Sequence, residues 1–187
     1  MIGLRTCAAE GQCAMQKLLI AYATRAGSTA QVAEFMGKVL REAGLQVDVM
    51  PVKQVRDLSG YSGVILGSPI RMGSVLPELI RFVKAHAQTL SRLPLAYFNV
   101  NLTLMDDTPE ARAIVDSYFN PLRVICAPLR VGAFAGKMDY ARLNSLLRFL
   151  LARDRDQIPE GDWIDWQAVR QWTLELLPLL QGERTSA

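Results

Sequence analysis

Apolar runs of strand length alternate with amphipathic stretches along most of the chain. The strand-length runs cover residues 17–23, 45–52, 63–68, 95–101 and 124–134. Stretches with apolar side chains at helical spacing cover residues 29–43, 76–89, 109–118, 140–153 and 165–180. Continuously apolar strands that alternate with helices are typical of a mostly parallel sheet covered on both faces. The pattern therefore predicts an α/β fold.

Several residues mark the expected ends of these elements. Gly44 is suited to end the first helix, and Pro77 is acceptable in the first turn of the second. Asp165 is the expected N-cap of the last helix. Pro128 lies inside the fifth apolar run, which implies an edge strand or a bulge there.

The length of 187 residues suits one domain with a sizeable core. We expect this domain to span residues 15–182, followed by a short tail at residues 183–187. Residues 1–14 contain no apolar stretch of the kind found in secretory signals, and we expect a disordered tail.

Composition excludes several kinds of chemistry. Three irregularly spaced cysteines argue against a disulfide framework, and the single histidine, His86, excludes histidine-rich metal sites. The net charge of +3 does not by itself indicate nucleic acid, and we expect no such partner. Because no apolar run reaches the roughly 18 residues needed to cross a bilayer, we expect a cytoplasmic protein.

The loop after the first strand, TRAGST, combines three hydroxyl side chains with a glycine just before a helix. It lacks the GxGxxG and GxxxxGK[ST] patterns of nucleotide-binding loops, and it contains no lysine. Hydroxyls and backbone N–H groups at a helix start suit one terminal phosphate, and Gly27 allows close approach of the backbone. The alternative is an ordinary strand-to-helix turn with Ser28 as the N-cap.

Three more loops follow the later strands, at the end of the sheet where ligands bind in such folds. They are SPIRMGS, NVNLTL and AFAGKMDY, at residues 68–74, 99–104 and 133–140. The first has Arg71 and Met72 at its apex, and Gly73 there can adopt positive φ. Apolar walls with amide partners suit a flat heteroaromatic ring, although Met72 and Phe134 also fit ordinary apolar loop positions.

These loops resemble those of a known group of proteins. TRAGST resembles the phosphate loop of the flavodoxin superfamily, and SPIRMGS resembles the loop that lines its flavin ring. VGAFAGKMDYARLNSLLRFLL and EGDWIDWQAVRQW resemble a narrower group, the flavodoxin-like menaquinone-dependent protoporphyrinogen IX dehydrogenases. The sequence departs from that group in two places. Position 72 is a methionine where the group has an aromatic residue. The segment after the fourth strand, LTLMDDTPEARA, is shorter and less basic than the corresponding insertion of the group.

The resemblance spans residues 17–180. It implies a flavodoxin-like, doubly wound, five-stranded parallel sheet in the order 2-1-3-4-5, with helices on both faces. It also implies FMN as the cofactor, with the chemistry carried by the flavin and with no catalytic side chain and no metal.

Carried over by position, the resemblance implies three sets of cofactor-binding residues. The phosphate would be held by Thr24, Arg25, Ala26, Gly27, Ser28 and Thr29. The ring and ribityl chain would be held by Ser68, Pro69, Ile70, Arg71, Met72, Gly73, Asn99, Val100, Asn101 and Leu102. The ring edge would be bordered by Phe134, Ala135 and Gly136. By charge and loop position, Arg71 and Lys137 are interpreted as partners for substrate propionates.

The function implied by the resemblance is an FMN-dependent oxidoreductase. It would pass electrons from protoporphyrinogen IX to a quinone and form protoporphyrin IX in heme biosynthesis. Three hypotheses stay open beside it: a flavodoxin-type electron carrier, an NAD(P)H:quinone reductase, and a flavin-free protein that binds a partner. The net charge of +3 disfavours the carrier, since carriers that dock on basic partners are usually acidic. A homodimer also remains open.

Two features lie beyond the proposed flavin loops. Residues 140–155 place leucines on one helical stripe flanked by arginines, a pattern that suits peripheral contact with the inner membrane face. A core-packed helix with solvated arginines is the alternative. Trp166, Val169 and Trp172 share one face of the last helix, and we expect them to pack against the sheet.

Overall fold

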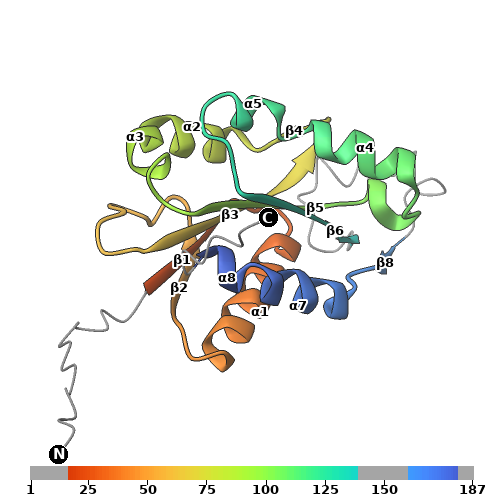
Figure 1. Cartoon of the computed structure of the whole chain (residues 1–187). Coiled ribbons are helices and arrows are strands. Elements are labelled where there is room, and N and C mark those ends of the chain that lie inside the picture. The colour runs from red at the N-terminus through yellow and green to blue at the C-terminus, as the bar shows by residue number, and fades with distance from the viewer. Residues whose placement is uncertain (1–16, 139–159, 181–187) are drawn as a thin grey trace, which may run out of the picture.

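A parallel sheet forms the centre of the protein, as shown by a computed structural model that describes residues 17–138 and 160–180 (Figure 1). Its strands lie in the order β2-β1-β3-β5-β6. They are β1 (Lys17–Tyr22), β2 (Gln46–Pro51), β3 (Gly63–Arg71), β5 (Leu95–Asn101) and β6 (Arg130–Ala135). Counted among themselves these five strands follow the order 2-1-3-4-5, so the predicted doubly wound topology is confirmed.

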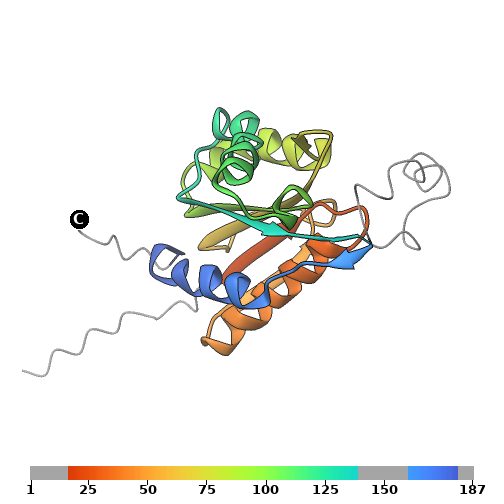
Figure 2. The same ribbon diagram turned by 90° about the vertical axis from the view of Figure 1, so that its right-hand side faces the viewer.

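Helices cover both faces of this sheet (Figures 1 and 2). One face is covered by α1 (Ser28–Glu42), α7 (Trp166–Glu175) and α8 (Leu177–Leu180). The other face is covered by α2 (Pro77–Ala85), α3 (Ala87–Leu90), α4 (Pro109–Ser117) and α5 (Asn120–Arg123). A short 3-10 helix, η1 (Thr103–Met105), follows β5.

The sheet divides the interior into two apolar cores because successive strand side chains point to opposite faces. Leu18 and Ile20 of β1 pack into the core with α1, α7 and α8. Leu19 and Ala21 pack into the core with α2, α3 and α5. All four side chains are at most 1% exposed, which explains why the strand reads as a continuous apolar run.

The fifth apolar run is only partly a strand. Asn120–Arg123 form helix α5, and the strand begins at Arg130 instead of Val124. The intervening segment is anchored by Cys126, whose carbonyl accepts a hydrogen bond of 2.8 Å from the Tyr97 hydroxyl. Cys126 is 5% exposed, whereas Val124 and Leu129 are 88% and 57% exposed, so only part of this apolar segment is buried. Strand β6 does lie at the sheet edge, as Pro128 implied.

Two predicted helices are each divided in two. The stretch 76–89 breaks at His86, whose φ of −111° lies outside the helical range, between α2 and α3. The half-buried His86 ring lies 4.6 Å from that of Phe82. The stretch 165–180 breaks at Leu176, and Pro178 follows in α8, because proline is tolerated only at the start of a new helix.

Helix α7 places its apolar residues as its periodicity indicates, with one exception. Val169 is fully buried, and Trp172 lies edge-on to Phe134 of β6 at a ring distance of 5.6 Å. Trp166 instead contacts Phe35 of α1 at 5.0 Å and is 38% exposed. The expectation that both tryptophans pack on the sheet is therefore wrong for Trp166, because α7 begins beside α1.

Three short strands were not predicted. β4 (Ser74–Val75) pairs antiparallel with the end of β3. β7 (Lys137–Met138) pairs antiparallel with β8 (Gly161–Asp162). Two-residue strands leave no period that a sequence pattern could reveal.

Several expectations concern residues outside the described ranges. They are the tail at 1–14, the helix at 140–153, the membrane-contact hypothesis for 140–155, and the tail at 183–187.

The cap of α7 gives a direct test of this part of the fold. The Asp165 carboxylate accepts hydrogen bonds from the backbone N–H groups of Gln167 and Ala168, at 2.9 and 3.0 Å, which confirms it as the N-cap. We expect Asp165→Ala to lower the free energy of unfolding by about 1 kcal/mol, measured by urea denaturation. The exposed Gln167→Ala serves as the control, and equal unfolding midpoints for the two variants would contradict the assignment.

Candidate functional site

The carboxyl ends of β1, β3, β5 and β6 lie at the same end of the sheet. The last paired residues are Tyr22 with Gly67 (β1–β3), Pro69 with Val100 (β3–β5) and Asn101 with Ala135 (β5–β6). All four predicted ligand-binding loops follow these strand ends. The structure therefore brings them to the place where ligands bind in open α/β sheets.

The loop after β1 exposes an uncapped helix start. Gly27 is the N-cap of α1, with φ of 96°, and Ser28 is the first helical residue. The interpretation of Ser28 as N-cap is therefore wrong, because the turn needs the left-handed conformation that glycine adopts readily. Thr24 Oγ1 accepts a hydrogen bond of 3.1 Å from the Gly27 N–H and holds the turn. With no side-chain cap and no acidic residue in the first turn, α1 can receive an anion here.

Thr29 adds an unused donor to this helix start. The residue is fully buried, and its Oγ1 has no hydrogen-bond partner among the described residues. Leaving a buried hydroxyl unpaired costs on the order of 1–3 kcal/mol. An oxygen of a bound anion would supply the missing partner.

The segment after β3 is a hairpin and not an open loop. β3 continues to Arg71, which pairs with Ser74 of β4, and the turn consists of Met72 and Gly73. Their φ values of 50° and 70° fit a two-residue turn of type I′. The expected apex at Arg71 and Met72 is therefore shifted by one residue, because Arg71 belongs to the ladder. The Met72 side chain is fully exposed at the tip.

Ser68 fastens the base of this hairpin. Its hydroxyl donates to the Pro69 carbonyl at 2.8 Å and accepts from the Leu76 N–H at 2.9 Å. The side chain is fully buried. Both hydrogen bonds are internal, so Ser68 positions the hairpin relative to the start of α2.

Two amides at the end of β5 share one network. Asn101 Nδ2 donates to Asn99 Oδ1 at 2.6 Å, and Asn101 Oδ1 accepts from the Leu104 N–H at 3.0 Å. Asn99 is fully buried, and its Nδ2 has no partner among the described residues. Asn101 thus braces the chain after β5, while Asn99 keeps a donor for a ligand.

The end of β6 approaches the site through its backbone. The Phe134 ring lies in the core beside Trp172, while the Gly136 N–H donates to the Asn101 carbonyl at 2.8 Å. A Cβ atom on Gly136 would lie 3.1 Å from Val100 Cγ1 and 3.3 Å from the Asn101 carbonyl oxygen, so a larger residue would require these neighbours to shift slightly. Lys137 Nζ lies 3.8 Å from Asp162 across the β7–β8 pair.

An ion pair joins the phosphate-type loop to α2. Arg25 Nη2 contacts Glu78 Oε1, and Lys53 Nζ lies 3.9 Å from the same oxygen. The hydrogen bond from Arg25 lowers the pKa of the Glu78 carboxyl below its ordinary value of 4.5. Sequence reasoning missed Glu78 and Lys53, because an acidic residue in a first helical turn is common and gives no sign of a partner 53 positions away.

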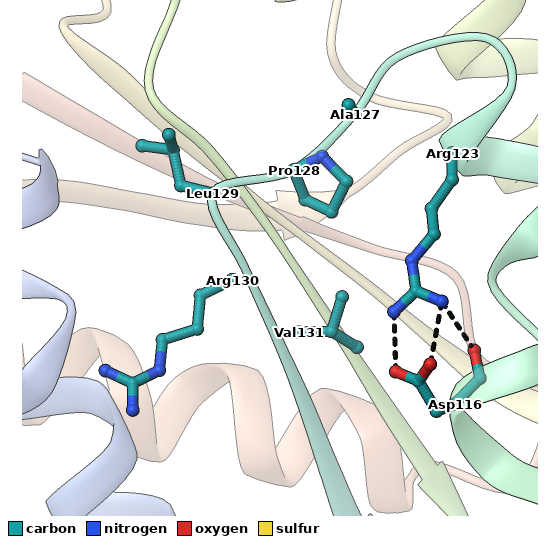
Figure 3. Close-up of a pocket in the computed structure, with 7 residues that line it drawn as sticks. All are labelled: Asp116, Arg123, Ala127, Pro128, Leu129, Arg130 and Val131. Carbon is teal, nitrogen blue, oxygen red and sulfur yellow. Dashed lines mark hydrogen bonds and ion pairs between the residues drawn. The ribbon is translucent and has the colours of Figure 1, made fainter. Parts of the chain in front are cut away.

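Two cavities differ in their relation to these loops. A small one of about 100 Å³ lies behind the phosphate-type loop and is bordered by Thr24, Arg25, Lys53 and Glu78. A larger one of about 430 Å³ lies near the start of β6 and is bordered by the ion pair of Arg123 with Asp116 (Figure 3). The second lies at the amino end of its strand, away from the four loops.

Among residues 17–138 and 160–180, no group of three or more histidine, cysteine, aspartate or glutamate side chains is arranged to hold a metal ion.

No helix in the described part of the chain is long and apolar enough to cross a membrane.

The sheet order and the loops at its carboxyl edge define a flavodoxin-like protein. A family model described as "Flavodoxin domain" matches residues 19–153. The chain belongs to this flavodoxin domain family and is a flavodoxin-like oxidoreductase. The family implies a flavin cofactor. The unpaired donors of Thr29 and Asn99 and the uncapped start of α1 fit such a group.

Two curated relatives match nearly the whole chain. One is the Escherichia coli (strain K12) protoporphyrinogen IX dehydrogenase [quinone], 28% identical over 175 residues, which cover 87% of this chain and 96% of that protein. The other is the Leishmania major protoporphyrinogen IX dehydrogenase [quinone], 31% identical over 186 residues, which cover 91% of this chain and 80% of that protein.

Solved structures with the same fold include two flavodoxins. Oxidised flavodoxin 1 from Bacillus cereus aligns with a TM-score of 0.56 at 17% identity, over 89% of this chain and 99% of that one. The flavodoxin of Streptococcus pneumonia TIGR4 aligns with a TM-score of 0.53 at 19% identity, over 86% of this chain and 97% of that one.

The charge state of Glu78 should appear in the acid stability of the protein. The pKa of the Glu78 carboxyl is lower in the folded chain than its ordinary value of 4.5. The ionised carboxylate therefore stabilises the fold above pH 4.5, and this contribution is lost as the pH falls through the folded pKa. We expect Glu78→Gln to weaken the fall in unfolding free energy below pH 4.5, measured by urea denaturation across pH. Glu110→Gln is the matched control, since Glu110 also follows a proline in a first helical turn. Equal pH dependence in all three proteins would contradict this.

Proposed function

We propose that this protein is an FMN-dependent oxidoreductase that passes electrons from a porphyrinogen-type substrate to a quinone. The observation that supports FMN is the start of α1, where Gly27 opens the turn and no side chain caps the helix. Such a start suits a single terminal phosphate, as a mononucleotide carries. The names of the E. coli and L. major relatives support the porphyrinogen donor and the quinone acceptor.

The residues of this chain would hold and orient the cofactor. The backbone of residues 25–29 and the hydroxyl of Thr29 would bind the phosphate. The hairpin at Met72 and Gly73 would border the ring, and the free amide of Asn99 would donate to its polar edge or to the ribityl chain. When bound, the flavin supplies the redox chemistry. We therefore assign no catalytic side chain.

Two cations are proposed to meet substrate carboxylates. Arg71 is exposed on the hairpin, directly before the turn. Lys137 is half-buried and 3.8 Å from Asp162, so its charge is partly compensated. Arg71 is therefore the better placed of the two for a propionate group. A quinone acceptor also supports peripheral membrane contact through the basic, leucine-rich sequence of residues 140–155.

Flavin content tests the cofactor assignment. We expect the purified protein to be yellow and to release FMN on denaturation. Thr29→Val should weaken FMN binding about tenfold, because the variant removes a hydrogen bond to a charged phosphate. Riboflavin, which lacks the phosphate, should bind both proteins equally in a fluorescence-quenching titration. The exposed Thr89→Val on α3 is the control, and unchanged FMN binding by Thr29→Val would argue against this phosphate site.

The electron donor separates the remaining functions. Under anaerobic conditions, we expect protoporphyrinogen IX to bleach the flavin absorbance and a menaquinone analogue to restore it. Bleaching by NADH or NADPH, but not by protoporphyrinogen IX, would identify an NAD(P)H:quinone reductase and reject the porphyrinogen donor. Bleaching by none of the three donors would favour an electron carrier. These outcomes are read in a stopped-flow spectrophotometer with the full-length protein.

A further inference from the structure

Arg25 lies in the phosphate-type loop, and its side chain contacts both α2 and the backbone of its own loop. Its Nη2 atom contacts Glu78 Oε1 on α2, and its Nη1 atom lies 3.4 Å from the Thr24 carbonyl. The guanidinium is thus engaged on the side of the loop that faces α2.

Glu78 is an unusual neighbour for an anion site. Its side chain is only 10% exposed, and Oε2 is buried without a hydrogen-bond partner among the described residues. The carboxylate lies in the first turn of α2 and borders the small cavity behind the loop. A buried negative charge so placed would repel a phosphate unless a cation compensated it.

Two cations share this one carboxylate, and they are not equivalent. Arg25 contacts Oε1 directly and is 44% exposed, whereas Lys53 lies 3.9 Å away and is 71% exposed. An exposed, flexible lysine at that distance is a weak counter-ion. Arg25 is therefore the group that neutralises Glu78 on the side of the phosphate-type loop.

We propose that Arg25 assists phosphate binding only by neutralising Glu78, whose unpaired carboxylate would otherwise repel the phosphate. The inference rests on the proposed FMN site and deepens it. Arg25 and Lys53 contribute two positive charges and Glu78 one negative charge, so the cluster presents one net positive charge behind the loop.

The two possible roles of Arg25 make opposite predictions for a double variant. If Arg25 bound the phosphate directly, removing Glu78 could not replace the lost contact. If Arg25 acts by neutralising Glu78, removing both charges leaves the same net charge as in the wild type. Comparison of the Arg25 single variant with the Arg25/Glu78 double variant therefore distinguishes the roles.

The experiment measures dissociation constants of FMN and riboflavin for the flavin-stripped, full-length protein. We expect Arg25→Gln to weaken FMN binding about tenfold while riboflavin binding is unchanged, because only FMN carries the phosphate that the uncovered carboxylate repels. Arg25→Gln/Glu78→Gln should bind FMN within about twofold of the wild type. Arg25→Lys should recover part of the loss, since it restores the charge without the guanidinium geometry.

Arg81→Gln, an exposed arginine on α2, controls for loss of one positive charge and should bind FMN like the wild type. Three results would overturn the inference: a double variant as weak as Arg25→Gln, a single Arg25→Gln variant with unchanged FMN affinity, or an equal loss of FMN and riboflavin binding. Failure of the wild type to bind FMN would reject the proposed function itself, and with it this inference.

Discussion

The parallel pairing of β1 with β3 is the constraint on which the rest of the site depends. It brings together two strands separated by α1 and β2 in the chain, so the loops that follow them emerge at neighbouring positions. One loop opens α1 and the other turns back as the β3–β4 hairpin. The helices α1 and α2 that follow these loops cover opposite faces of the sheet, which is the arrangement at which ligands bind in open α/β sheets.

The polar side chains near these strand ends are of two kinds: some form internal hydrogen bonds, and others have donors without a hydrogen-bond partner among the described residues. Thr24, Ser68 and Asn101 use their side chains to fix a turn, a hairpin base and a strand end. Thr29 and Asn99 are buried but keep unused donors within the described structure. Each unpaired buried group costs stability, and a ligand oxygen at this place would offset that cost. The division separates polar side chains that are used within the structure from those whose donors remain unpaired.

Patterning along the chain predicted most of the fold, because a doubly covered sheet requires apolar strands of recognisable length. It failed where an apolar run is not a strand and where a periodic stretch is not one helix. Val124–Leu129 form a loop that is held to Tyr97 through Cys126 and that leaves Val124 and Leu129 exposed. His86 breaks a stretch with continuous helical periodicity. The four loops were located correctly, since they follow strand ends. The contact of Arg25 with Glu78 was not predictable, because it joins residues whose separation in sequence carries no period.

The two cores on opposite sides of the sheet have a mechanical consequence. The phosphate-type loop leads into the layer of α1, and the hairpin leads into the layer of α2. Both helix layers pack on the same sheet. At the carboxyl ends of its strands, the ion pair of Arg25 with Glu78 links the loop that precedes α1 to helix α2. A cofactor bound by both loops would form a second link between the two helix layers. Because a bound cofactor would contact loops from both layers, its binding energy would stabilise the two layers together.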